Sequence, residues 1–248
     1  MWGVWVGFDE ESRSNLLASI IDEDYLTTGF VYVIEAPSDI DLIDGRTEGR
    51  ALCEALRLAE IQHWYSLTTT RRSFDESLGT RLAEAYAKLQ LPPILHLSMH
   101  GNDQGVQLTD GTFLSWSDLQ KALVPLTNAM NGGLLICMSS CFGSAGCRMA
   151  MHQEKDQPFW ALVGNNASAS WADAAVAYIT FYHLFFKGLS AEQCLEGMKH
   201  ASGDHNFMLW SGHKVKAEWG ALMSQAKRNQ LAEALRAGGH GLLAGGER

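Results

Sequence analysis

The chain has 248 residues, of which 46% are hydrophobic and 19% charged, so it can bury a substantial core and is not a disordered protein. It carries 19 Lys and Arg against 28 Asp and Glu, which gives a net charge of −9. Binding to nucleic acid depends on basic residues that neutralise phosphates, so an acidic chain without a Lys/Arg-rich run argues against that function.

In the first half of the chain, predicted strands and helices alternate. A β-branched and aromatic strand stopped by a proline, and a helix with a possible Ser73-x-x-Glu76 capping box, are the clearest of them. In order, we predict a strand over 2–8, a strand over 29–36, a helix over 49–60, a strand over 61–69 and a helix over 73–91.

The second half begins with an apolar strand over 94–99. A hairpin over 105–116 follows, turning at Asp110-Gly111, and then a helix over 115–123 capped by Ser115 or Ser117. The remaining elements are strands over 133–138 and 158–164 and helices over 171–188 and 190–202, the last capped by Ser190.

This alternation, with at least three strands that are apolar on both faces, predicts an α/β fold. We expect a mainly parallel sheet with helices on both faces. No repeat, Pro-rich linker or shift in composition divides the chain, so a single domain over 1–248 is predicted. The Gly-rich segment 236–248 is expected to be a loose tail.

The N-terminal segment has no basic region ahead of an apolar stretch, which is not typical of a signal peptide. The most apolar run, AAVAYITFYHLFFKG, is shorter than the ~20 residues of a membrane-spanning helix. The five cysteines are odd in number and are expected to be free thiols. We therefore predict a cytoplasmic protein that binds no membrane.

Two of the predicted core strands end in a reactive side chain. The run ILHLSM leads into His100-Gly101, and the run GLLICMSS leads into Cys141. Reactive groups collect at the carboxyl ends of parallel strands, so neighbouring strands would bring both side chains to one edge of the sheet. Alone, a cysteine at a strand end is usually a buried thiol and His-Gly is usually a turn. Together they suggest a thiol nucleophile with an imidazole that takes its proton.

The glycine after the histidine adds to this interpretation. Gly101 permits a sharp turn and exposes its backbone N–H. With the N–H of Cys141, it makes a plausible oxyanion hole with two donors.

The order strand–His–Gly, hairpin, helix, strand–Ser-x-Cys-x-Gly resembles the caspase-like (clan CD) cysteine peptidases. The likeness is greatest to the CHAT-domain type, which is related to separase. It covers about residues 29–202 and includes the hairpin GVQLTDGTFLSWSDL and the strand and helices after Cys141. The caspase signature Gln-Ala-Cys-x-Gly is matched only at Cys141 and Gly143, which departs from the strict caspases and their Asp preference.

The resemblance implies a caspase-like fold with a small hairpin after the catalytic His, and it implies proteolysis. Cys141 would attack the scissile carbonyl, His100 would protonate the leaving amine, and the N–H groups of Gly101 and Cys141 would hold the oxyanion. No third acidic member and no cofactor are expected. The alternatives are a catalytically silent binding or scaffold module, and a thiol hydrolase that acts on a non-peptide acyl donor.

The resemblance also suggests how the activity is controlled. CHAT domains are often fused to sensor regions, whereas the predicted core takes up almost all of this sequence. We therefore expect activation in trans by a partner protein or by a small-molecule ligand, with nucleotide-derived ligands among the candidates. By analogy the setting would be a bacterial stress or antiviral response.

Four further residues are candidates for the substrate pocket. Related peptidases place pocket residues after the strand predicted over 158–164, which points to Asn165, Trp171 and Asp173. Asp173 would favour a basic substrate residue, but Ser170-x-x-Asp173 is also a capping box. Turn chemistry explains Asn165 equally well, and Asp103 is a candidate that also fits a simple loop position.

The other histidines and cysteines on these strands are expected to be structural. His96 has the same side-chain parity as His100 and is interpreted as a core histidine with a partner. Cys137 and Cys147 are expected in the core. No second close pair of cysteines accompanies them, as a zinc module would require, so no metal site is predicted.

Overall fold

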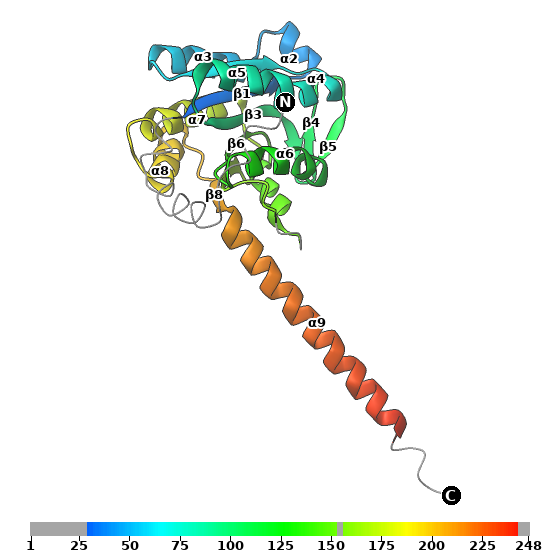
Figure 1. Ribbon diagram of the computed structural model, residues 1–248. Coiled ribbons are helices and arrows are strands. Elements are labelled where there is room, and N and C mark those ends of the chain that lie inside the picture. The colour runs from blue at the N-terminus through cyan, green and yellow to red at the C-terminus, as the bar shows by residue number, and fades with distance from the viewer. Residues whose placement is uncertain (1–28, 153–155, 243–248) are drawn as a thin grey trace, which may run out of the picture.

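In the computed structural model, which describes residues 29–152 and 156–242, a sheet of eight strands lies at the centre (Figure 1). Its main path runs β2-β1-β3-β6-β7-β8, and β4 and β5 extend the end of β3 as a hairpin. Neighbours are parallel from β2 to β7, and β8 is antiparallel to β7. The strands are β1 (Phe30–Ala36), β2 (His63–Leu67), β3 (Pro93–Asn102), β4 (Gly105–Gln107), β5 (Phe113–Ser115), β6 (Leu135–Ser139), β7 (Ala161–Asn165) and β8 (Phe207–Ser211).

Helices cover both faces of this sheet. One face packs against α4, α5 and α6 and a 3₁₀ segment (Gly143–Ala150), and the other against α3, α7 and α8. The helices are α2 (Asp39–Ile43), α3 (Glu48–Leu58), α4 (Arg71–Glu76), α5 (Leu82–Leu89), α6 (Trp116–Ala129), α7 (Trp171–Phe185), α8 (Ala191–Ser202) and α9 (Gly212–Leu242). The predicted fold class, mainly parallel and consistent with a caspase-like fold, is confirmed.

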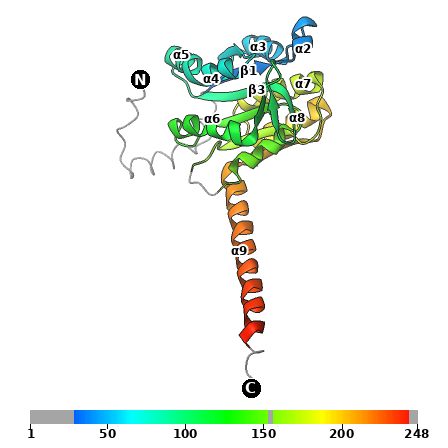
Figure 2. The ribbon, with the colours of Figure 1, turned by 90° about the vertical axis from the view of Figure 1, so that its right-hand side faces the viewer.

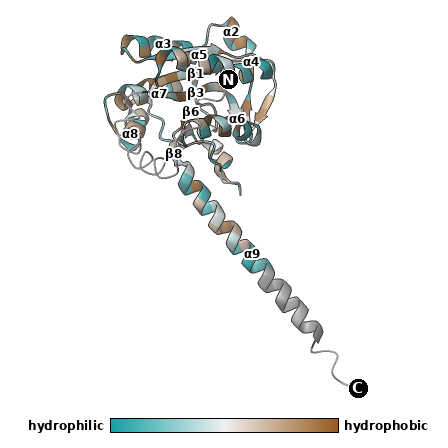
Figure 3. Ribbon diagram, viewed as in Figure 1, coloured by the Kyte–Doolittle hydropathy of each residue, from teal (hydrophilic) through white to brown (hydrophobic). Residues whose placement is uncertain are grey.

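Alternating side chains of the central strands supply two cores. In β1, Tyr32 and Ile34 belong to the core beneath α4–α6, whereas Val31 and Val33 belong to the core beneath α3 and α7. Because both faces are covered, all seven residues of β1 are buried. Figure 3 shows hydrophobic residues gathered in the central strands and in the faces of the helices that meet them.

Most predicted elements are present, with their boundaries shifted by a few residues. The turn at Asp110-Gly111 is confirmed, with Gly111 at a φ of 85° and the Leu108 N–H donating to the Thr112 carbonyl at 2.9 Å. Ser115 and Ser190 cap α6 and α8 as predicted, and α6 continues to Ala129. The strand predicted over 2–8 lies outside the described residues.

The helix predicted over 73–91 differs from the expectation. It begins at Arg71, and its N-cap is Thr70, whose hydroxyl accepts from the Ser73 N–H while the Ser73 hydroxyl accepts from the Thr70 N–H. The predicted capping box at Ser73 and Glu76 is therefore wrong, because Ser73 is the N3 partner of an earlier cap. A π-helical turn (Ser77–Arg81) then separates α4 from α5.

Three elements were not predicted: the short helix α2, the antiparallel edge strand β8 and the long helix α9. Figures 1 and 2 show α9 extending away from the α/β body. Residues from 236 were expected to be loose, whereas α9 continues to Leu242, and the helix formers of the run LAEALR (231–236) favour its propagation into that segment. None of the described helices is both long enough and apolar enough to cross a membrane.

Candidate active site

His100 and Cys141 lie at the same edge of the sheet because β3 and β6 are parallel neighbours. Ser98 and Ser139 are register partners on these strands. His100 and Cys141 each come two residues after this last register pair, so both emerge at the same edge of the sheet. The neighbouring strands expected from the sequence are therefore confirmed, and the hairpin and α6 form the crossover between them.

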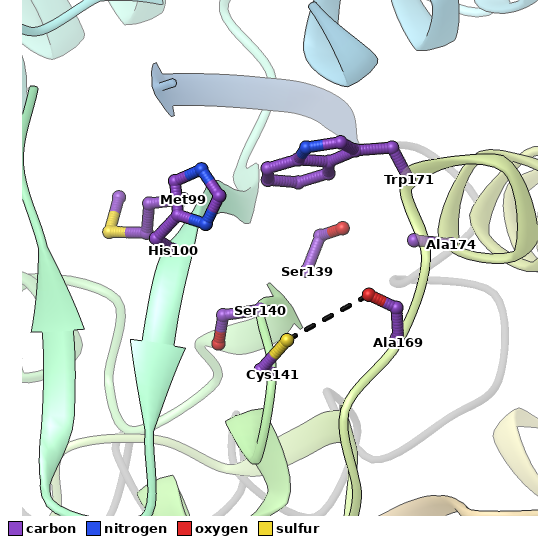
Figure 4. Close-up of a pocket in the computed structure, with 8 residues that line it drawn as sticks. All are labelled: Met99, His100, Ser139, Ser140, Cys141, Ala169, Trp171 and Ala174. Atoms are coloured by element: carbon purple, nitrogen blue, oxygen red, sulfur yellow. Dashed lines mark hydrogen bonds between the residues drawn. The ribbon is translucent and has the colours of Figure 1, made fainter. Parts of the chain in front are cut away.

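The two side chains share one small cavity of about 80 Å³ (Figure 4). Met99, Ser139 and Ser140 form its base with His100 and Cys141. The remaining wall is formed by the loop after β7, which contributes Ala169, and by the first turn of α7, which contributes Trp171 and Ala174. The cavity thus brings together the ends of β3 and β6 and the start of α7.

Asp41 holds the His100 ring from the side away from the cysteine. The His100 Nε2 lies 2.7 Å from Asp41 Oδ2, and the Trp171 ring packs edge-on against the imidazole with centroids 5.2 Å apart. In Figure 4 the second ring nitrogen is on the side of the imidazole nearer the Cys141 sulfur. An Nε2–H that donates to a carboxylate leaves Nδ1 with a lone pair. The tautomer set by Asp41 therefore presents a proton acceptor to the cavity.

Asp41 is itself fixed by its position in α2, which follows directly after β1. Its side chain is 8% exposed. Ser38, the N-cap of α2, donates its hydroxyl to Asp41 Oδ2 at 2.6 Å, and Arg46 Nε lies 3.3 Å from Oδ1. Burial alone raises the pKa of this carboxyl, but the hydrogen bonds from Ser38 and His100 and the charges of His100 and Arg46 outweigh it and lower the pKa.

Asp41 was not predicted from the sequence, and no acidic third member was expected. A signal was present: Ser38-x-x-Asp41 is a helix-start pattern immediately after the strand 29–36. Because β1 is the neighbour of β3, an acid just past its end reaches the same edge as His100.

The thiol of Cys141 contacts the wall of the cavity. Its Sγ lies 3.8 Å from the carbonyl oxygen of Ala169, and no hydrogen bond joins it to His100 in the described structure. The next residue, Phe142, has a φ of 56°, and its N–H donates to the Ala167 carbonyl at 2.9 Å. The chain therefore turns sharply at Cys141 and is fastened to the loop that carries Ala169.

The backbone around Gly101 and Cys141 is closely packed. A Cβ added to Gly101 would come within 3.0 Å of the Cys141 carbonyl and 3.2 Å of the Ser140 Cβ. In the part of the chain that the structure describes, the Cys141 N–H donates to no backbone carbonyl. Whether the two N–H groups act on an oxyanion stays a prediction.

The predicted pocket residues lie in different environments. Trp171 lines the cavity. Asp173 is exposed and accepts the Ser170 hydroxyl at 2.7 Å, in agreement with the cap interpretation, and it does not reach the cavity wall. Asn165 is buried and joins Asp204 to the Ala167 N–H. Asp103 is exposed, and its carbonyl accepts from Trp116 and Arg148. A role in substrate binding for Asp173, Asn165 and Asp103 stays a prediction.

The histidine and cysteines expected in the core are found there. His96 and Cys137 are fully buried, and Cys147 is 7% exposed. The His96 Nδ1 lies 3.1 Å from the Tyr182 hydroxyl, which is the partner that a buried histidine requires. Over residues 29–152 and 156–242, no group of three or more His, Cys, Asp or Glu is arranged to hold a metal ion.

Comparisons with known proteins were made with the sequence and with the structure. No protein-family model and no curated protein matches the sequence. Among solved structures, the chain is similar to the complex of the pro- and mature domains of RgpB from Porphyromonas gingivalis, with a TM-score of 0.47 and 9% sequence identity. The match covers 76% of this chain and 48% of that one, so this chain spans about half of that structure. So distant a likeness concerns the arrangement of sheet and helices at most.

Proposed function

We propose that this chain is a caspase-like cysteine endopeptidase that uses Cys141 as nucleophile and His100 as general base and acid. The observation that carries the proposal is that one cavity is lined by both side chains, while Asp41 holds the far nitrogen of the imidazole. A thiol, an oriented base and a third group that orients the base are the three parts of an acyl-transfer site.

The reaction follows from these positions. The Cys141 thiol gives its proton to His100 Nδ1, and the sulfur attacks the scissile carbonyl. The N–H groups of Gly101 and Cys141 stabilise the resulting oxyanion. The imidazolium then protonates the leaving amine, the C–N bond breaks, and a thioester forms on Cys141. His100 next takes a proton from water, whose oxygen attacks the thioester and releases the acid product and the free thiol.

The thiol now contacts Ala169 rather than His100, and this is compatible with the proposal. Catalytic hydrogen bonds are often long in the absence of substrate and tighten when it binds. The loop with Ala169 is held by Asn165 and by the Phe142 N–H, so a ligand that moves this loop would also release the thiol. This is where we place the expected control in trans by a partner protein or small ligand.

The test is reaction of the purified full chain with a peptidyl acyloxymethyl ketone, an activated small ester and iodoacetamide, followed by intact mass and site mapping. A peptidase reacts with the ketone at Cys141 and cleaves unfolded protein. Reaction with the ester but not the ketone would indicate a thiol hydrolase with a non-peptide substrate. Slow, equal alkylation of several cysteines would indicate a silent binding module.

Control in trans has a separate test. We expect the rate of Cys141 labelling to rise when extract of the source cells or a panel of nucleotides is added to the purified chain. Full activity of the purified chain alone, unchanged by these additions, would contradict it.

A further inference from the structure

The cavity beside the Cys141 thiol has neutral walls. Besides His100 and Cys141 themselves, it is lined by residues whose side chains have no ionisable group: Met99, Ser139, Ser140, Ala169, Trp171 and Ala174. The nearest acid, Asp41, already accepts from Ser38 and His100. A charged side chain inside the cavity would therefore lose water without gaining an opposite charge.

The cavity is also small. Its volume of about 80 Å³ is several times the ~10–15 Å³ that a single water needs and well below the ~150 Å³ of a site that holds benzene. The indole of Trp171 and the Ala174 methyl group limit it on one side (Figure 4). This space suits a side chain the size of threonine or asparagine better than an arginine or an aromatic ring.

Two hydroxyl groups of the wall, those of Ser139 and Ser140, make no hydrogen bond within the described structure, and in Figure 4 only the Ser139 hydroxyl is directed toward Trp171 and Ala174. Ser139, the last residue of β6, is 1% exposed, so its hydroxyl is buried. In Figure 4 this hydroxyl is directed into the space between His100, Trp171 and Ala174. A buried hydroxyl without a partner is unfavourable, so an incoming donor or acceptor that pairs with it is favoured over an apolar group of the same shape.

We infer that this cavity binds a small, uncharged, hydrogen-bonding side chain of the substrate, of the class of threonine, serine or asparagine, through Ser139. The inference rests on the proposed function, because the occupant is the residue whose carbonyl Cys141 attacks. The cavity borders the thiol, so a substrate carbonyl at the sulfur places its own side chain at the cavity entrance. Ser139 is a specificity-determining residue in this arrangement.

The neighbouring strand supplies a matched control. Ser98 is the register partner of Ser139, is equally buried at 1% exposure and also has a hydroxyl without a partner. It does not line the cavity. Removing its hydroxyl therefore reproduces the chemical change at the same depth without touching the proposed subsite.

The experiment uses peptidyl acyloxymethyl ketones that differ only in the residue next to the ketone: threonine, its isostere valine, asparagine, arginine, aspartate and phenylalanine. The second-order rate of modification of Cys141 is measured by intact mass. We expect the threonine and asparagine reagents to react at least about tenfold faster than the others, because valine leaves Ser139 unpaired. In Ser139→Ala the threonine-to-valine ratio falls to about 1, and in Ser98→Ala it stays at the wild-type value.

A second variant addresses size and guards against a folding defect in the first. Ala174→Val narrows the cavity and should slow the asparagine reagent more than a glycine reagent, so the ratio of these two rates should fall below its wild-type value. Equal rates for threonine and valine, or a preference for arginine, aspartate or phenylalanine, would overturn the inference and leave the peptidase proposal intact. An arginine preference would instead favour Asp173. Alkylation of Cys141 by iodoacetamide with no reaction of any ketone would refute the proposed function, and the inference with it.

Discussion

Strands β3 and β6 carry two His–Cys pairs, and only one of them meets the requirements for chemistry. His96 and Cys137 are register partners inside the sheet. His100 follows His96 by four residues, and Cys141 follows Cys137 by four residues. The inner pair is fully buried. In the outer pair the His100 side chain is 42% exposed and borders a cavity. Residue type and parity are therefore shared, and only the distance from the sheet edge differs.

Burial decides what the inner pair can do. Desolvation raises the pKa of the Cys137 thiol to about 12, although a hydrogen bond with Tyr182 opposes the shift. His96 lies 3.1 Å from the Tyr182 hydroxyl and 3.4 Å from Glu48 Oε2, and its ring is edge-on to Tyr178. These contacts hold the inner histidine as part of the core. The comparison shows that a strand end, rather than a His–Cys juxtaposition alone, creates a candidate nucleophile.

The largest expected difference between the pairs concerns the cysteines. Cys141→Ala removes the proposed nucleophile and should lower peptide-ketone labelling and proteolysis by a factor of at least about 10⁴. Cys137→Ala leaves the site intact and should keep the wild-type rate, while the small cavity it creates lowers the free energy of unfolding by about 1 kcal/mol. Intact-mass kinetics and urea unfolding of both variants measure this. Loss of labelling in Cys137→Ala with its stability unchanged would break the comparison.

For the two histidines we expect a smaller difference in the rate of Cys141 labelling, with the outer residue again the more important one. His100→Ala should slow labelling of Cys141 by about 10²–10⁴, the usual contribution of a general base, with unfolding little changed. His96→Leu should leave the labelling rate within about threefold. It should destabilise the protein by about 2 kcal/mol, because Glu48 and Tyr182 lose a buried partner. Rates that fall equally in the two variants would show that His100 acts through structure only.

Much of this fold could be predicted because its strands and helices have strong local patterns. The buried strands β1, β3 and β6 are continuous apolar runs, and helices such as α6 and α8 begin at serines that cap them. What could not be predicted depends on tertiary partners. The strand β8 exists through its antiparallel pairing with β7, and four of its five residues are only partly buried or exposed, so its sequence has no clear alternation.

The candidate site divides in the same way. His100 and Cys141 could be found because each ends an apolar run, and parallel pairing brings such ends together. Asp41 is 59 residues before His100, in a helix of only five residues, and no local pattern distinguishes it from any other N-terminal helix acid. Ala169 and Ser139 are ordinary residues by type. The cavity that they share depends on how the loop after β7 packs against the end of β6, which local sequence does not encode.

The smallest and most specific effects are expected at Asp41, which distinguishes the outer histidine from the inner one by fixing its tautomer. Asp41→Asn presents an amide N–H to His100 Nε2 and favours the tautomer whose Nδ1–H faces the thiol, so labelling at neutral pH should fall by about a hundredfold. Asp41→Ala removes the tautomer preference of His100 without inverting it, so the labelling rate should fall by only about tenfold. If Asp41 had only a structural role, the isosteric change Asp41→Asn would not slow labelling more than Asp41→Ala does. Asp39→Asn, an exposed acid in the same turn, is the control and should have no effect.

The pH dependence of stability follows from the lowered pKa of Asp41. A carboxyl whose pKa is lower in the folded than in the unfolded protein stabilises the fold fully above its ordinary pKa of about 4, and that contribution is lost as pH falls through the lower value. The difference in melting temperature between wild type and Asp41→Asn should therefore be constant from about pH 5 to 7 and shrink below about pH 4. A difference that instead grows on acidification would mean that His100, rather than the Asp41 carboxylate, dominates this pair, and the tautomer argument would lose its basis.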